Sequence, residues 1–249
     1  MNKISIIVIV ILCCSIVVSG QGIITDRPDQ TESSLTIQVK SLQIESGLLL
    51  EFLGEDGLNS ERSILAPTTL IRYGLLDFAE VRIVSQIENI KNKSNNITGI
   101  KDLEIGAKLQ LLKKKQVSLE IALLSHLIIP SGSKEVTGNT SGLINKVCVS
   151  HKTNSNIDIG YNLGYNYFDD DSESFTYSVV IGLGINERAS IYFEPYGEVL
   201  NLDKNLTNIN SGITYLLRDN FQLDFSFGSG INYTFNYVAT GFSWNISAD

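Results

Sequence analysis

Residues 157–168 read IDIGYNLGYNYF, and large apolar side chains stand at every second position, from Ile157 through Leu163 to Tyr167. Small and polar residues fill the positions between them. An alternation with a period of two is typical of a β-strand whose two faces meet different surroundings. The pattern recurs about twelve times between Ser41 and Ile246, with turns between the repeats, and this is the sequence signature of an outer-membrane β-barrel.

The alternating runs predict the bounds of the strands. We expect strands at Ser41–Phe52, Ile64–Tyr73, Phe78–Ile87, Lys101–Leu112, Val117–Ile129, Leu143–His151, Ile157–Phe168, Phe175–Asn186, Ala189–Val199, Asn208–Leu217, Phe221–Gly230 and Phe235–Ile246.

The connections between these runs alternate between long and short. The long ones are Leu53–Ser63, Glu88–Ile100, Pro130–Gly142, Asp169–Ser174, Leu200–Thr207 and Ser229–Thr234; the short ones are Gly74–Asp77, Lys113–Gln116, Lys152–Ser155, Glu187–Arg188 and Arg218–Asn220. Bacterial outer-membrane barrels have an even number of strands, short periplasmic turns and longer external loops. The pattern therefore predicts an all-β, antiparallel up-and-down transmembrane barrel of about 12 strands, with both termini in the periplasm.

The sequence divides into four predicted segments. Residues 1–20 combine Lys3 with an apolar run from Ile4 to Val18, which is typical of a secretory signal peptide. Residues 21–40 are polar and irregular and form an N-terminal periplasmic segment that could plug the barrel. Residues 41–246 form the barrel, and residues 247–249 form a short C-terminal tail.

Composition excludes several classes of protein. Once the signal peptide is removed, Cys148 is the one remaining cysteine, so a small domain held together by disulfides is excluded. Lys and Arg number 19 against 27 Asp and Glu, a formal net charge of −8, which argues against a nucleic-acid partner. A soluble closed barrel would alternate in the same way, but with its apolar face inside. Charges of both signs and several glycines on the polar face favour a wet interior instead.

Residues at every second position of a strand share a face, and this parity places ten charged residues on the lumen face. The set is Glu45, Arg72, Glu80, Arg82, Glu104, Lys108, Glu120, Asp158, Glu194 and Asp224. Arg72 and Glu80 share this face across one tight turn, which requires an odd loop length or a bulge. The charges could form a structural network that fills the lumen, or a zone that selects the solute.

The segment after the signal peptide carries a family resemblance. Thr25, Asp26, Arg27, Pro28, Asp29, Gln30, Thr31 and Glu32 resemble the start of Bacteroidetes-type outer-membrane proteins labelled "transporter" or "putative MetA-pathway of phenol degradation". Later strings, such as LIRYGL at residues 70–75 and FEPYG at residues 193–197, are similar to the same family in order. The resemblance implies an outer-membrane barrel that transports small solutes, with aromatic molecules among the candidates.

Arg27 leads to a hypothesis about the plug. The lumen charges in the periplasmic half are mostly acidic, so Thr25–Glu32 could fold into the periplasmic mouth and pair Arg27 with lumen carboxylates. The alternative is a surface segment that covers the base of the barrel.

The function expected is a narrow channel or facilitator for small solutes, without a cofactor. Its partners would be outer-membrane lipid, the solutes and the barrel-insertion machinery, and the oligomeric state stays open. One rival is a structural or adhesive barrel that acts through its loops. Another is an outer-membrane lipid hydrolase, but His126 follows Ser125 directly, so the two side chains point to opposite faces. No metal-ligand spacing and no catalytic serine motif occurs.

Overall fold

The structure is a computed structural model that describes residues 23–54, 60–114, 118–153 and 156–247. The predicted signal peptide at residues 1–20 lies outside the described residues. No helix in the described part of the chain is long and apolar enough to cross a membrane. The strands are β1 (Leu42–Leu53), β2 (Glu61–Leu76), β3 (Ala79–Lys91), β4 (Asn96–Ile100), β5 (Leu103–Lys114), β6 (Leu119–Ile129), β7 (Gly142–Lys152), β8 (Ile157–Phe168), β9 (Glu173–Gly184), β10 (Ala189–Leu200), β11 (Lys204–Arg218), β12 (Phe221–Gly230) and β13 (Phe235–Ile246).

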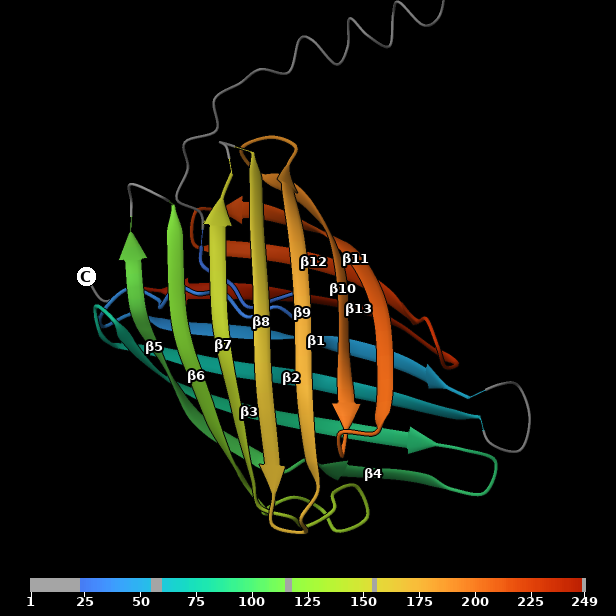
Figure 1. Ribbon diagram of the computed structural model, residues 1–249. Coiled ribbons are helices and arrows are strands. Elements are labelled where there is room, and N and C mark those ends of the chain that lie inside the picture. The colour runs from blue at the N-terminus through green and yellow to red at the C-terminus, as the bar shows by residue number, and fades with distance from the viewer. Residues whose placement is uncertain (1–22, 55–59, 115–117, 154–155, 248–249) are drawn as a thin grey trace, which may run out of the picture.

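Antiparallel pairing between successive strands closes the sheet into a ring. β1 pairs with both β2 and β13, and β2 pairs with β3, so no free edge separates the first strand from the last. β3 pairs with β4 through its later residues and with β5 through its earlier ones. β4 therefore lies outside a closed ring of twelve strands, as Figure 1 shows beside the end of β3. The predicted twelve-stranded up-and-down barrel is confirmed.

The extra strand β4 is a correction to the sequence prediction, which treated Glu88–Ile100 as a loop. β3 continues to Lys91, and the side-chain oxygen of Asn92 accepts hydrogen bonds from the backbone N–H groups of Ser94 and Asn95. Such an asparagine turn reverses the chain over a few residues. The chain after the turn then pairs with β3, from Asn96 opposite Lys91 to Ile100 opposite Ile87.

The alternation of loop lengths was also wrong for the second half of the barrel. The expected loop Leu200–Thr207 shrinks to residues 201–203, and the loops at residues 169–172 and 231–234 are no longer than the turn 185–188 at the opposite end. Polar residues continue the strand ladders beyond the apolar belt, because backbone pairing does not require apolar side chains. The apolar alternation marks where the wall meets lipid, and in β2 and β11 it ends before the strand ends.

The two faces of the wall have opposite character. Outward side chains are apolar and exposed, for example Leu163 at 52%, Ile213 at 53% and Phe227 at 53%. Inward Arg72 and Lys108 have no exposed area. A soluble barrel would show the reverse, so this arrangement confirms the predicted apolar exterior.

A register shift near the β2–β3 turn sets the position of two lumen charges. Gly74 pairs with Glu80 and Leu76 pairs with Ala79, so Leu75 is left over as a bulge. Arg72 consequently stands opposite Arg82 and diagonal to Glu80. Side chains at diagonal positions are within reach of long residues, and Nε of Arg72 lies 2.9 Å from Oε1 of Glu80. The bulge required by the sequence is confirmed.

The lipid-facing assignment predicts the effect of a charge on the exterior. Leu163→Arg, near the middle of β8, should lower the free energy of unfolding by about 2–4 kcal/mol, because arginine would face the bilayer midplane. The measurement is a denaturant titration in lipid vesicles. The control is Leu202→Arg, in the connection 201–203, where the change should be near zero. Equal losses in the two variants would contradict the assignment.

Candidate functional site

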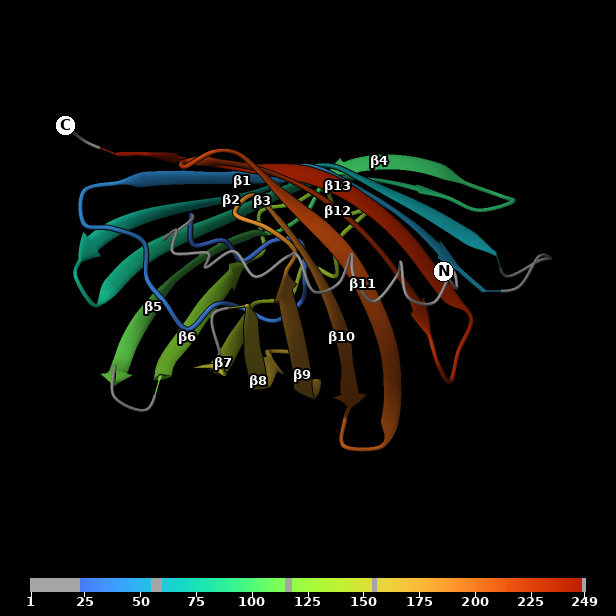
Figure 2. The same cartoon turned by 90° about the horizontal axis from the view of Figure 1, so that it is seen from above.

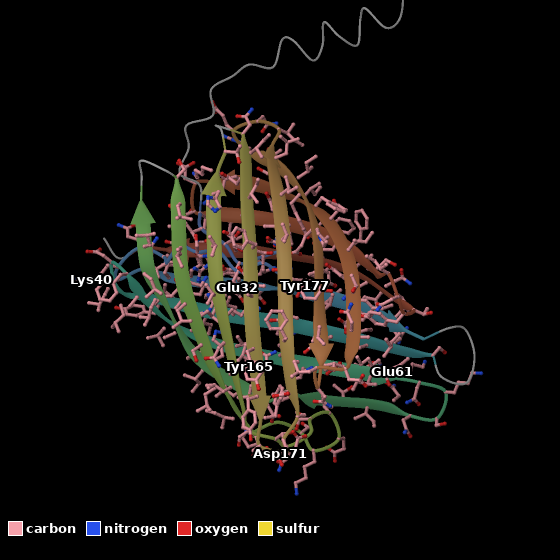
Figure 3. The ribbon with its side chains drawn as sticks, viewed as in Figure 1. Glu32, Lys40, Glu61, Tyr165, Asp171 and Tyr177 are labelled. Carbon is pink, nitrogen blue, oxygen red and sulfur yellow. The ribbon has the colours of Figure 1, made fainter. Side chains whose placement is uncertain are left out.

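Residues 23–41, called the N-terminal segment below, run inside the ring of strands. Figure 2 shows this segment in blue, crossing the space enclosed by the wall before it enters β1. Ser34 and Ile37 in the segment are 0% and 2% exposed. In Figure 3, Glu32 of the segment lies within the barrel, whereas Lys40 lies at the end where β1 begins and Glu61 lies at the opposite end of the β1–β2 hairpin.

Asp26 of the segment sits among three cations from the wall. Its carboxylate lies 2.5 Å from Nη1 of Arg82, 2.9 Å from Nζ of Lys108 and 3.2 Å from Nη1 of Arg72. These cations come from β3, β5 and β2. Burial alone raises the pKa of Asp26, but the charges of Arg72, Lys108 and Arg82 outweigh it and hold the pKa well below its usual range. Asp26 therefore stays ionised at neutral and mildly acidic pH.

The same cations also meet carboxylates of the wall. Arg72 lies 2.8 Å from Glu45 and 2.9 Å from Glu80, and Arg82 lies 2.9 Å from Glu80. Glu32 of the segment adds a contact of 2.8 Å to Arg82. We call Asp26, Glu32, Glu45, Arg72, Glu80, Arg82 and Lys108 the ion network. Buried charges are tolerated when every one is paired and hydrogen-bonded, and the network meets this condition.

Backbone groups of the segment complete the ion network. The N–H groups of Asp26 and Ile37 donate to Glu45 and Glu80 at 3.0 and 2.8 Å. Arg72 donates in turn to the carbonyl oxygen of Ile24 at 3.0 Å. The ion network thus fixes the backbone conformation of the segment and also neutralises the charges of its side chains.

Glu194 on the opposite wall holds the middle of the segment. Its carboxylate accepts hydrogen bonds from the N–H of Gln30 at 2.9 Å, the hydroxyl of Thr31 at 2.6 Å and the side chain of Asn210 at 2.6 Å. The Thr31 oxygen also lies 2.7 Å from Oγ of Ser178. The segment therefore spans the lumen from the β1–β5 wall to the β9–β11 wall.

Arg27 lies against Asp224 of β12. Its Nη2 and Nε atoms are 2.8 and 3.1 Å from the two carboxylate oxygens. Gly47 and Gly241, which pair across β1 and β13, leave the space for the guanidinium. A Cβ atom at Gly47 would lie 2.6 Å from Nη2 of Arg27, and one at Gly241 would lie closer still. The two glycines thus leave the wall without side chains at the point where the guanidinium of Arg27 lies.

Three more of the charged residues predicted for the lumen face lie outside the ion network, and one of them contacts the N-terminal segment. Glu104 lies 2.9 Å from Nδ1 of His126, whose Nε2 accepts a hydrogen bond from Arg82 at 3.1 Å. Glu120 receives a long hydrogen bond of 3.4 Å from Ser34. Asp158 is exposed at the end of β8, opposite Lys152, and does not join the ion network.

The remaining residues of the sequence motif connect these contacts. Thr25 donates a hydrogen bond to the carbonyl oxygen of Arg27 and accepts one from Gln222 of β12. Pro28 and Asp29 lie between Arg27, which contacts Asp224, and Gln30, which contacts Glu194. Among the described residues, no group of three or more His, Cys, Asp or Glu side chains could hold a metal ion.

Sequence reasoning missed an inward-facing aromatic row, which consists of Tyr233, Phe235 and Tyr237. The ring centroids of successive members are 5.7 and 6.0 Å apart. Tyr237 is 4% exposed and lies over Gly228 of β12, so the row faces the lumen. Parity could have found it, because Tyr237 stands an odd number of residues before Trp244, which is exposed on the outer face.

Other inward positions away from the ion network are apolar too. Ile128 and Phe168 meet at Gly142, where an added Cβ atom would lie 3.2 Å from Ile128 and 2.6 Å from the Phe168 ring. Tyr192 lies over Gly212 and is 8% exposed. The lumen therefore has a charged part around the ion network and a part richer in apolar and aromatic side chains.

A closed ring with an apolar exterior and a charged interior defines a β-barrel of the outer-membrane type. The chain belongs to the family described as "Putative MetA-pathway of phenol degradation", whose model matches residues 25–246. No curated protein matches the chain by sequence.

Solved structures show the same fold. An outer membrane channel from Pseudomonas putida F1 superposes with a TM-score of 0.73 at 9% identity, covering 86% of this chain and 98% of that one. The KdgM porin in complex with disordered oligogalacturonate gives 0.57 at 12% identity, with 81% and 98% covered. The NanC porin gives 0.55 at 9% identity, with 82% and 98% covered. At these identities the likeness concerns the fold.

The ion network predicts a large stability effect of a single substitution. Arg72→Met keeps the length of the side chain but leaves Glu45 and Glu80 without their shared cation, and should cost about 3–5 kcal/mol of unfolding free energy. Arg218→Met, at the exposed end of β11, is the control and should cost less than about 1 kcal/mol. Unfolding by denaturant in vesicles measures both. A loss for Arg72→Met as small as that of the control would show that the network contributes little.

Proposed function

We propose that this protein is a narrow channel of the outer membrane for small solutes, and that aromatic molecules are among them. The observation that carries the proposal is the aromatic row inside a closed barrel. A lumen that served only water and ions would be lined by polar side chains. Stacked and tilted rings at 5.7 and 6.0 Å instead offer a surface on which another aromatic ring can pack.

In this proposal the N-terminal segment restricts passage. It crosses the lumen and is fixed to opposite walls by Asp26, Arg27 and Thr31. A solute that leaves the aromatic row must pass this segment to reach the other side. The ion network then sets which charges the solute meets.

We also propose that both chain ends face the periplasm. The longest described connections, the β3–β4 hairpin and residues 130–141, lie at the end of the barrel opposite the start of β1. Bacterial barrels place their longer loops outside the cell. The aromatic row is near the start of β13, so it lies at the outer end and meets an incoming solute first.

A transport role without catalysis agrees with the surroundings of His126. Its ring nitrogens contact Glu104 and Arg82, whereas the hydroxyl of Ser125 donates to Asn145 on the other face of β6. A serine hydrolase requires the serine and histidine side chains within hydrogen-bond reach. Among the described residues, His126 has no serine partner of this kind.

The proposal predicts selective flux of aromatic solutes. Benzenesulfonate and cyclohexanesulfonate have the same charge and similar size, and neither crosses lipid readily. Wild-type protein in liposomes should transport the aromatic compound several-fold faster. Tyr233→Ala combined with Phe235→Ala should bring the ratio of the two rates close to one, because the stacking surface is lost.

The matched control removes two aromatic rings from the outside. Phe225 and Phe227 are also two residues apart, on the exposed face of β12, at 44% and 53% exposure. Their double alanine variant should keep the wild-type ratio. A ratio near one for the wild-type protein, or the same ratio in both double variants, would overturn the proposed aromatic preference.

A further inference from the structure

A cationic row lies on the outward face of the barrel, at the ends of β1, β2 and β3 farthest from the start of β1. Phe52 pairs with Arg62, and Arg62 pairs with Lys91, so the three side chains stand side by side on one face. All three are exposed. Lys93 follows in the turn between β3 and β4 and is also exposed.

These residues line a surface crevice with a volume of about 370 Å³. Phe52, Arg62, Lys91 and Lys93 contribute to it, together with Leu53 and Glu61. The lining thus includes three cations, one carboxylate and two apolar side chains. Its size suits a head group rather than a single ion.

The cations of the crevice lack carboxylate partners within the described residues. Arg62 and Lys91 stand directly opposite each other on neighbouring strands, and like charges in this position are destabilising. None of Arg62, Lys91 and Lys93 forms an ion pair with a described residue. An anion bound between them would offset the repulsion. Arginine in particular binds phosphate through two parallel hydrogen bonds.

The wall next to the cationic row is apolar. Leu50 pairs with Ile64 on the same outward face, two residues along from Phe52 and Arg62. Phe52, on the same face, is 45% exposed. The surface therefore changes from aliphatic to cationic over a short distance. This change is complementary to a lipid whose acyl chains lead to an anionic head group. Basic pockets on membrane proteins bind anionic head groups in this way.

We propose that the crevice is a binding site for the phosphate groups of a glycolipid of the lipid A type in the outer leaflet. Arg62 and Lys91 bind one phosphate group between them, and Lys93 contacts the same head group. Phe52 packs against the upper part of the acyl chains. The inference rests on the proposed orientation, in which this end of the barrel faces outward, and it does not depend on the solute.

The test measures lipid binding to the full-length mature chain in detergent micelles by native mass spectrometry. Arg62→Gln combined with Lys91→Gln should weaken binding of bisphosphorylated lipid A at least ten-fold. The matched control is Lys134→Gln combined with Lys204→Gln, which removes two exposed lysines from the same end of the barrel but not from the crevice. It should change binding less than two-fold. Heat-modifiable migration on a gel checks that each variant is folded.

Two further ligands identify the chemistry. Lipid A without phosphate groups should bind the wild-type protein as weakly as bisphosphorylated lipid A binds the Arg62→Gln, Lys91→Gln variant. Inorganic phosphate alone should bind more weakly than the phosphorylated lipid. The proposal is overturned by equal losses in the two double variants, by tight binding of the phosphate-free lipid, or by free phosphate that binds as tightly as the lipid.

The orientation is tested separately, so that its failure can be told apart from a failure of binding. Lys93→Cys should react with a membrane-impermeant maleimide on intact cells if this end faces outward. Cys148 is fully buried and serves as the unreactive background. Labelling only after the cells are opened would overturn the orientation, whereas lipid binding in micelles would be unaffected by it.

Discussion

The contact between Asp26 and the three cations around it holds the N-terminal segment inside the lumen. Without Asp26 and Glu32, the wall part of the ion network has Arg72, Arg82 and Lys108 against only Glu45 and Glu80. The N-terminal segment supplies the missing carboxylates. On the other side of the lumen the roles are reversed, because Arg27 of the segment meets the wall carboxylate of Asp224. Asp26, Arg27 and Glu32 of the segment therefore each meet a wall residue of opposite charge.

The lumen consequently has two parts that differ in the side chains that line them. The ion network is buried and its charges are paired, which favours one arrangement of the side chains, because each buried charge would be costly to leave alone. The part beyond it presents the aromatic row and neighbouring apolar side chains, which pack without strict geometry. In the proposed orientation, a solute binds weakly in the second part before it meets the restriction in the first. Three loops at this end, residues 169–172, 201–203 and 231–234, are shorter than the sequence suggested, which leaves a smaller loop surface for an adhesive role.

The sequence predicts local features well and long-range ones poorly. β8, β12 and β13 have the bounds that the alternation predicts, because each wall residue meets either lipid or lumen. Parity also places Arg72 and Glu80 on one face. The sequence does not reveal that Asp26 meets Lys108, since these residues belong to separate elements and their approach depends on closure of the ring. β4 escaped prediction because Asn96–Ile100 is short and lies beyond the apolar belt. The aromatic row was overlooked because aromatic residues in the strands of an outer-membrane barrel are expected in girdles on the lipid-facing side.

The central claim is that the ion network holds the N-terminal segment across the lumen. Single-channel conductance in planar bilayers, compared between the wild-type protein and a chain that lacks residues 21–36, tests it most directly. The account predicts that the deletion raises the conductance several-fold, because the peptide that crosses the lumen is gone. A conductance identical to that of the wild-type protein would contradict it.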